Sequence, residues 1–200
     1  LAWSSAASDV YKRQDMNHEA LFFYKLNKWL LQQANATWDN PHNFEFVNQH
    51  FKDSTRNVLL QNLKGKRRFS YLGYGKGFKY SNIEKLDSPW CWKDPANTIT
   101  LDLWRTIFPD AKIVFIYRHP LDVAASLSAR TAKRMANKYS RNWKVKLKES
   151  LLYKEPIYAF SYRTSDTLEA INLWEHYNKK ALEHQEKIPP SHFHLSLIHI

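Results

Sequence analysis

An arginine and a serine stand eight residues apart in the segment 116–126, which reads IYRHPLDVAAS. Arg118 directly follows an apolar run at 111–117, and Ser126 lies in a stretch that is typical of a helix beginning near Pro120. Such a continuous apolar run is typical of a strand buried on both faces of a parallel sheet, and proline suits the first turn of a helix. The pattern therefore predicts a cation at the carboxyl end of a strand, beside a helix start.

A second cation, Lys93, follows the short apolar segment 90–92, which is a strand candidate. The turn KDPANT comes next, and Asn97 or Thr98 can cap a helix that ends before Pro109. Ligands of open parallel sheets bind at the carboxyl ends of the strands. If the strands at 90–92 and 111–117 are neighbours, both cations face one crevice.

The chemistry of that crevice has two interpretations. Helix N-termini favour anions, a guanidinium grips phosphate with two hydrogen bonds, and a lysine adds a point charge. Alternatively, each cation simply pairs with a carboxylate, for which Asp94 and Asp122 are available. The residues alone leave both interpretations open.

The remaining pattern predicts the elements around this site. Apolar spacing indicates helices at 18–33 and 44–64 and a long helix that begins at Ser165 or Asp166 and ends at Pro189. The segment 64–80 holds all four glycines and reads as a loop. Strand, helix, strand, helix is typical of βαβ units. The fold class is therefore α/β, a parallel sheet flanked by helices.

Composition limits the function classes. The chain has 200 residues, of which 44% are hydrophobic and 15% aromatic, enough for the core of one domain. No apolar run approaches the roughly 20 residues that span a bilayer. Cys91 is the only cysteine, so no internal disulfide forms, and a reducing, cytoplasmic setting fits. A net charge of +11 indicates an anionic partner.

Both ends look foreign to the rest of the chain. Reverse-translated, SSAASDVYKRQ at 4–14 and LSLIHI at 195–200 match opposite strands of one transposon-based sequencing adapter. We therefore expect 1–14 and 195–200 to be adapter-derived and 15–194 to be a partial natural domain. The alternative is an N-terminal coil and a short C-terminal strand. Removing 1–14 lowers the charge excess by only one.

The segment 130–148 holds eight basic residues and no acidic one. It is either a solvated helix face or a flap over an anionic ligand. A nucleic-acid surface needs aromatic rings among the cations, and this segment offers only Tyr139 and Trp143. The histidines show no metal-ligand spacing, so no metal is expected.

The segment FPDAKIVFIYRHPLDVAASL resembles the 3′-phosphate-binding segment of sulfotransferases that use 3′-phosphoadenosine 5′-phosphosulfate (PAPS). The resemblance, closest to bacterial members, implies that Arg118 and Ser126 bind the 3′-phosphate of the nucleotide. WKDPANTITLDLW resembles the preceding segment of the family, which implies that Lys93 lies near the transferred sulfuryl group. Ala96 stands where relatives often have arginine, so any contact of that arginine is absent or replaced.

The resemblance also implies the fold and the donor. It predicts an incomplete P-loop NTPase-like sulfotransferase fold, PAPS as co-substrate, adenosine 3′,5′-bisphosphate as product, and no metal. The family begins with a strand and a phosphate-binding turn, and nothing in 15–194 matches them. GYGKG at 73–77 lacks the G-x-x-x-x-G-K-[ST] order and reads as a flexible loop. The fragment itself is therefore expected to be inactive.

The expected reaction moves a sulfuryl group from PAPS to a hydroxyl or amine of a carbohydrate, a peptide or a small molecule. By the resemblance, Glu19 is the candidate general base, with His18 and Asp39 as alternatives; a solvated surface role competes for each. Two other functions stay open. One is a non-catalytic module of the same fold that binds an anionic nucleotide or glycan, and the other is a basic nucleic-acid-binding protein.

Overall fold

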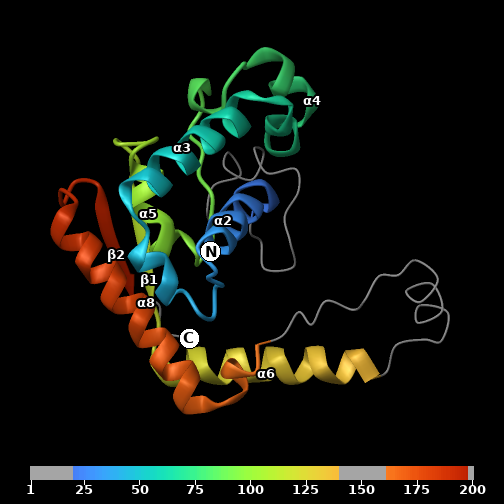
Figure 1. Ribbon diagram of the computed structural model, residues 1–200, viewed down its shortest axis with the longest axis vertical. Coiled ribbons are helices and arrows are strands. Elements are labelled where there is room, and N and C mark those ends of the chain that lie inside the picture. Colours follow the sequence, from blue (N-terminus) through green and yellow to red (C-terminus); the bar gives the residue numbers. More distant parts are fainter. Residues whose placement is uncertain (1–19, 140–160, 198–200) are drawn as a thin grey trace. The chain divides into compact units, whose positions relative to one another are not determined.

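The computed structural model describes residues 20–139 and 161–197 (Figure 1). The chain divides into two compact units between Ala111 and Lys112. Each unit is described by itself. The candidate base Glu19, its alternative His18, the whole N-terminal segment 1–14 and residues 140–148 of the basic segment lie outside the described residues.

The first unit is helical. Its helices are α2 (Leu21–Gln33), α3 (Gln49–Lys64), α4 (Phe69–Lys79) and α5 (Asn97–Arg105), with short 3-10 turns η1 (His42–Phe46), η2 (Lys66–Arg68) and η3 (Ile83–Lys85). The helices expected at 18–33 and 44–64 are confirmed. The second is interrupted at Val47, and α3 begins where the Asn48 side chain accepts a hydrogen bond from the Phe51 amide at 2.9 Å.

Aromatic rings form the centre of the first unit. Phe23 of α2 is fully buried and stacks on Trp92 with centroids 4.2 Å apart. Tyr71 of α4 and Trp104 of α5 meet the same ring edge-on, at 5.0 and 5.6 Å. Aromatic pairs prefer these stacked and T-shaped arrangements. Helix α4, helix α5 and the segment before Lys93 therefore all pack against the Phe23 ring of α2.

The prediction of a loop at 64–80 is wrong, because most of this segment is helix α4. Gly73 has a φ of 71° and ψ of 176°, so the helix is kinked there. A Cβ added at Gly77 would lie 2.4 Å from the Phe69 ring. These glycines therefore permit a kink and a close ring contact within a helix.

The prediction of a strand at 90–92 is also wrong in the described structure, where this segment has no regular secondary structure and pairs with no strand. The carbonyl of Cys91 accepts a hydrogen bond from the Tyr71 hydroxyl at 2.9 Å. The rings of Trp90 and Trp92 lie in the aromatic core. Side-chain contacts of α2 and α4 thus hold this segment in place of a sheet.

The second unit is a small parallel sheet flanked by helices, which confirms the α/β class. Strand β1 (Ile113–Tyr117) pairs in parallel with β2 (Phe193–Leu197), in the register Ile113 to Phe193. The helices are α6 (Pro120–Tyr139) and α8 (Thr167–Lys187), preceded by η4 (Arg163–Ser165). β2 includes 195–197, the start of the LSLIHI stretch, and the domain limits stay a prediction.

Strand β1 is less buried than its sequence predicts. Val114 and Ile116 are 43% and 42% exposed. The expectation of burial on both faces is wrong because the side chains of β1 alternate between more and less covered positions, so one face of the strand is less covered than the other. In the described residues β1 pairs only with β2, so the strand is part of a narrow sheet.

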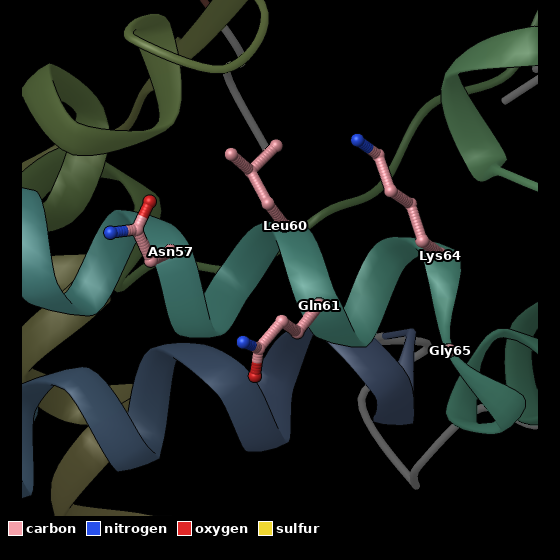
Figure 2. A pocket seen from close by; sticks show the side chains of 5 residues that line it. All are labelled: Asn57, Leu60, Gln61, Lys64 and Gly65. Atoms are coloured by element: carbon pink, nitrogen blue, oxygen red, sulfur yellow. The ribbon is translucent and has the colours of Figure 1, made fainter.

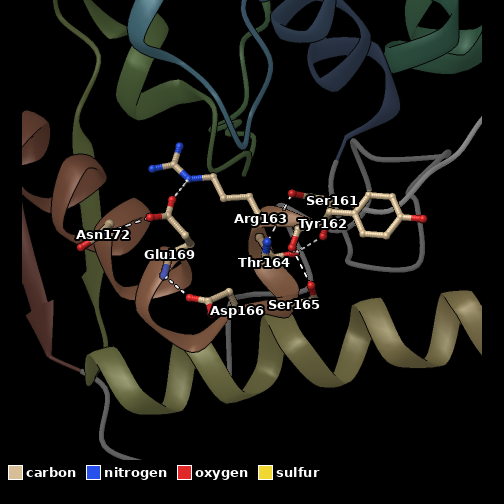
Figure 3. A network of polar contacts seen from close by, with 8 residues as sticks. All are labelled: Ser161, Tyr162, Arg163, Thr164, Ser165, Asp166, Glu169 and Asn172. Atoms are coloured by element: carbon tan, nitrogen blue, oxygen red, sulfur yellow. Dashed lines mark hydrogen bonds and ion pairs between the residues drawn. The ribbon is translucent and has the colours of Figure 1, made fainter.

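Helix α8 begins and ends as predicted. The Asp166 side chain accepts a hydrogen bond from the Glu169 amide at 2.8 Å, and Arg163 pairs with Glu169 at 2.8 Å (Figure 3). Within the same turn, the buried Thr164 hydroxyl contacts the Thr131 hydroxyl of α6 at 2.9 Å. The polar turn η4 therefore ties α8 to α6.

The two longest helices, α6 and α8, have 20 and 21 residues and carry charges along their lengths. Of the helices that the structure describes, none is both long and apolar enough for a membrane crossing.

Candidate functional site

Arg118 lies at the junction between β1 and α6. It directly follows the last strand residue, and α6 begins two residues later at Pro120, as predicted. The main-chain carbonyl of Arg118 accepts a hydrogen bond from the Trp174 indole at 3.0 Å. The Trp174 ring also packs edge-on against Tyr117, with centroids 5.5 Å apart. Helix α8 therefore fixes the backbone from which the Arg118 side chain projects.

Replacing Trp174 with phenylalanine tests this anchor. The variant keeps a ring against Tyr117 but removes the donor to the Arg118 carbonyl, which we expect to cost about 1 kcal/mol of unfolding free energy. Urea denaturation of the variant and the wild type measures the difference. Trp29→Phe is a matched control, because Trp29 is half-buried in the other unit and its indole donates no hydrogen bond within the described residues. Equal losses in the two variants would contradict an anchoring role for Trp174.

Ser126 is exposed on α6, six residues after Pro120. At a rise of about 1.5 Å per residue it stands about 9 Å along the helix from its first residue. Asp122 precedes Ser126 by four residues and Arg130 follows by four, so the three share one side of the helix. The structure thus places Ser126 in the same unit as Arg118, on the element that directly follows it.

The Arg118 side chain is half-buried. Within the described residues, its guanidinium makes no hydrogen bond and no ion pair, and Asp122 forms no ion pair with it. The alternative that this arginine only neutralises Asp122 therefore has no support in the described contacts.

Lys93 is exposed at the beginning of the KDPANT turn in the first unit. Asp94 is buried, and its Oδ1 accepts a hydrogen bond from the Ala96 amide at 2.9 Å. Its Oδ2 accepts another from the Asn27 side chain at 2.7 Å. Asp94 therefore holds the turn that begins at Lys93.

Asn27 of α2 is the residue that the sequence analysis missed. Its side chain is completely buried and makes four hydrogen bonds. The amide nitrogen donates to Asp94 and Asn97, and the amide oxygen accepts from Thr100 at 2.9 Å and Trp104 at 2.7 Å. A carboxylate only accepts and an indole only donates, so the amide has one possible orientation.

The turn differs from its prediction at the cap of α5. Asn97 and Thr98 are helical, and Ala96 is the cap residue, with no side-chain hydrogen bond. The Asn97 oxygen instead accepts from the Trp92 indole and from Asn27, both at 2.8 Å. Because the Asn97 side chain is hydrogen-bonded across the turn, it does not cap α5. The signal for the network was a polar residue at position 27, four residues after Phe23 on an apolar helix face.

The candidate residues belong to different units. Lys93 lies in the first, and Arg118 and Ser126 lie in the second, so a crevice shared by both cations stays a prediction. Asp39 is half-buried in the first unit, where its carboxylate accepts a hydrogen bond from the Thr37 hydroxyl at 2.6 Å.

An open hollow on α3 involves none of these candidates. It is lined by Asn57, Leu60, Gln61, Lys64 and Gly65 (Figure 2). Its lining offers one cation and two amides, with no acid or nucleophile. The hollow therefore adds no catalytic group to the site.

Comparison with known proteins gives one match. The model described as the sulfotransferase family matches residues 7–195, which include the Lys93 turn, Arg118 and Ser126. No curated protein and no solved structure matches the chain significantly.

Proposed function

The chain belongs to the sulfotransferase family, and from this premise we propose that it serves sulfuryl transfer from PAPS to a hydroxyl or amine. The family match over 7–195 carries the proposal, because one matched segment includes the Lys93 turn as well as Arg118 and Ser126. We further propose that the protein is a bacterial-type member, as the resemblance implies. We also propose a reducing, cytoplasmic setting, and the presence of only one cysteine supports it.

Arg118 and Ser126 are proposed to bind the 3′-phosphate of the nucleotide. Arg118 offers a guanidinium without a partner in the described residues, at the end of β1 and beside the start of α6. The N-terminus of a helix adds favourable partial positive charge for an anion. Ser126 is exposed on the same helix and can donate its hydroxyl proton.

Lys93 is proposed to stabilise the transferred group. In the transfer, the acceptor oxygen or nitrogen forms a bond to sulfur while the bond from sulfur to the nucleotide phosphate breaks. The departing electron pair leaves negative charge on the phosphate oxygen of adenosine 3′,5′-bisphosphate. A positioned ammonium group stabilises such charge, and the Asn27–Asp94 contact holds the turn that carries Lys93.

The acceptor must also lose a proton. Glu19 remains the proposed base, with His18 and Asp39 as alternatives, and a carboxylate or imidazole within hydrogen-bond reach of the acceptor would suit that role. The proposed acceptor is a hydroxyl or amine of a carbohydrate, a peptide or a small molecule. The proposed chemistry requires no metal.

A binding module without turnover is the second candidate, because residues 15–194 contain no G-x-x-x-x-G-K-[ST] turn for the 5′-phosphosulfate. We expect these residues alone to bind adenosine 3′,5′-bisphosphate without transferring sulfate. Transfer is expected from a protein in which a 5′-phosphosulfate turn precedes them.

Sulfate-labelled PAPS with a pool of acceptors tests both candidates. In the turn-containing protein, Lys93→Ala should lower kcat by about 100-fold, the usual effect of losing one charge-stabilising donor. Nucleotide affinity should change little. Lys28→Ala, which removes another exposed cation of the first unit, is the control. Label transfer by residues 15–194 alone would contradict the need for the turn, and absence of nucleotide binding would contradict the proposed function itself.

A further inference from the structure

Helix α4 exposes a cluster of aromatic rings. Tyr74 and Phe78 are 79% and 78% exposed, and they lie four residues apart on one face of the helix. Phe69 joins them, with its ring centroid 5.1 Å from that of Phe78 and 6.1 Å from that of Tyr74. We call these three residues the aromatic knob. Large apolar groups that stay in water together mark interaction sites.

The knob is held by a built framework. Tyr71 and Leu72, which precede the kink at Gly73, are 2% and 1% exposed and fix the first part of α4 to the core of the first unit. Gly77 leaves room for the Phe69 ring against the backbone, where a Cβ would lie 2.4 Å away. The contact between Phe69 and Gly77 therefore joins the part of α4 that carries Tyr74 and Phe78 to the part that is fixed in the core.

Arg68 braces both ends of this helix. Its guanidinium donates to the carbonyls of Lys64 and Gly65 before α4 and to those of Gly77 and Tyr80 near its end, at 2.9 to 3.0 Å. This arginine keeps its positive charge but uses its donors within the protein, so the exposed Lys66 and Arg67 are the neighbouring cations that can contact an external anion.

The chain around the knob is basic. From Ser54 to Ile83 it has no acidic residue, and its basic residues are Arg56, Lys64, Lys66, Arg67, Arg68, Lys76 and Lys79. Lys66 and Arg67 are exposed within three residues of Phe69. Lys79 pairs with Asp87 at 3.0 Å, so its charge is partly compensated. Apolar rings thus stand among uncompensated positive charges.

We propose that the aromatic knob and its flanking cations dock on an anionic lipid surface. Exposed phenylalanine has no hydrogen-bonding group to offer a polar partner, and rings of this kind bury themselves at the boundary between headgroups and acyl chains. Lysine and arginine beside them are attracted by anionic headgroups. The Phe69 and Phe78 planes meet at 71°, so they form a compact apolar projection and not the flat, separated platforms on which nucleic-acid bases stack.

Sedimentation with lipid vesicles tests the proposal on the full chain. We expect binding to phosphatidylcholine vesicles that contain about 30% phosphatidylserine, weak binding to phosphatidylcholine alone, and a decline with added salt. The double variant Tyr74→Ser/Phe78→Ser should lower the partition coefficient by at least about tenfold. Lys66→Gln/Arg67→Gln should weaken binding only to the anionic vesicles.

Phe46→Ser is the matched control, because Phe46 is 82% exposed in the same unit but lies beside Glu45. Its vesicle binding should equal that of the wild type, and unchanged melting curves should show that all variants fold. Equal binding to both vesicle types, or equal losses in the Phe46→Ser variant and the Tyr74→Ser/Phe78→Ser double variant, would overturn the proposal. So would binding of a soluble sulfated polysaccharide through Phe78 without any binding to vesicles.

Discussion

Replacing Asn27 with alanine should lower the unfolding free energy of the first unit by about 3 kcal/mol. The substitution removes all four hydrogen bonds of a completely buried amide. It leaves Asp94 and the Trp104 indole with a missing partner in a buried setting, and each unsatisfied buried group costs about 1–3 kcal/mol. Urea denaturation followed by tryptophan fluorescence measures the loss, since Trp92 and Trp104 both lie in the network.

Asn62→Ala is the control for this experiment. Asn62 is half-buried on α3 and donates to the Val58 carbonyl of its own helix at 2.8 Å. Its replacement should cost less than about 1 kcal/mol, because water and the helix satisfy the groups it leaves. Equal losses at positions 27 and 62 would contradict the central position of Asn27 in the network.

Asn27→Asp adds a pH test. The new carboxylate would replace the donor that lies 2.7 Å from the Asp94 Oδ2. Two carboxylates at that distance share a proton, which raises the pKa of the pair in the folded state above its value of about 4 in the unfolded chain. Stability from this pair is present at low pH and is lost as the pH rises through the raised pKa. The deficit relative to wild type should therefore be larger at about pH 8 than at about pH 4.5.

Replacing Arg118 with alanine should weaken binding of adenosine 3′,5′-bisphosphate at least tenfold, or about 1.4 kcal/mol. A guanidinium binds phosphate through two parallel, charge-assisted hydrogen bonds, and a methyl group makes none. Arg118→Lys keeps the charge but loses the geometry of two parallel hydrogen bonds, so its affinity for the nucleotide should fall between those of the wild type and Arg118→Ala. Ser126→Ala removes a single donor and should cost less than Arg118→Ala. Isothermal titration calorimetry measures all four proteins.

Lys112→Ala is the control for Arg118→Ala, because it also removes one positive charge from the second unit. Lys112 is exposed in the same unit and precedes β1, at the opposite end of the strand from Arg118. Its replacement should leave affinity almost unchanged at physiological salt, where exposed charges are largely screened beyond about 8 Å. Equal affinity of Arg118→Ala and wild type would remove Arg118 from the nucleotide site. Equal losses in the Arg118 and Lys112 variants would indicate only non-specific attraction.

Elements with a regular apolar period were predictable from sequence. Helix α8, whose start was predicted at Ser165 or Asp166 and which is capped by Asp166, and the succession of β1 and α6 around Pro120 follow from spacing and cap residues. The segment from Arg118 to Ser126 was recognisable because its residues are adjacent in the chain. Local patterns suffice to predict the strand and the helix that carry Arg118 and Ser126, and the binding role of these two residues stays a prediction.

The errors arose where distant residues decide the local structure. The segment 90–92 has the composition of a strand. In the structure the Tyr71 hydroxyl donates a hydrogen bond to the Cys91 carbonyl and the Phe23 ring stacks on Trp92, and the segment forms no strand. The glycines of α4 suggest a loop, but Arg68 bridges the two ends of the helix and Phe69 fills the space beside Gly77. Asn27 is 67 residues from Asp94 in the chain, so no local window connects them.

The two-stranded sheet also affects how the protein behaves in concentrated solution. Beside the exposed Val114 and Ile116 of β1, β2 exposes Leu195 and Leu197, at 38% and 61%. In the described part of the chain, each strand has one edge that pairs with no other strand. Apolar side chains next to unpaired backbone groups are a template for strand addition by a second molecule. Self-association should therefore limit the concentration at which the protein can be purified. Replacing one of these exposed apolar residues with a charged residue should reduce the self-association.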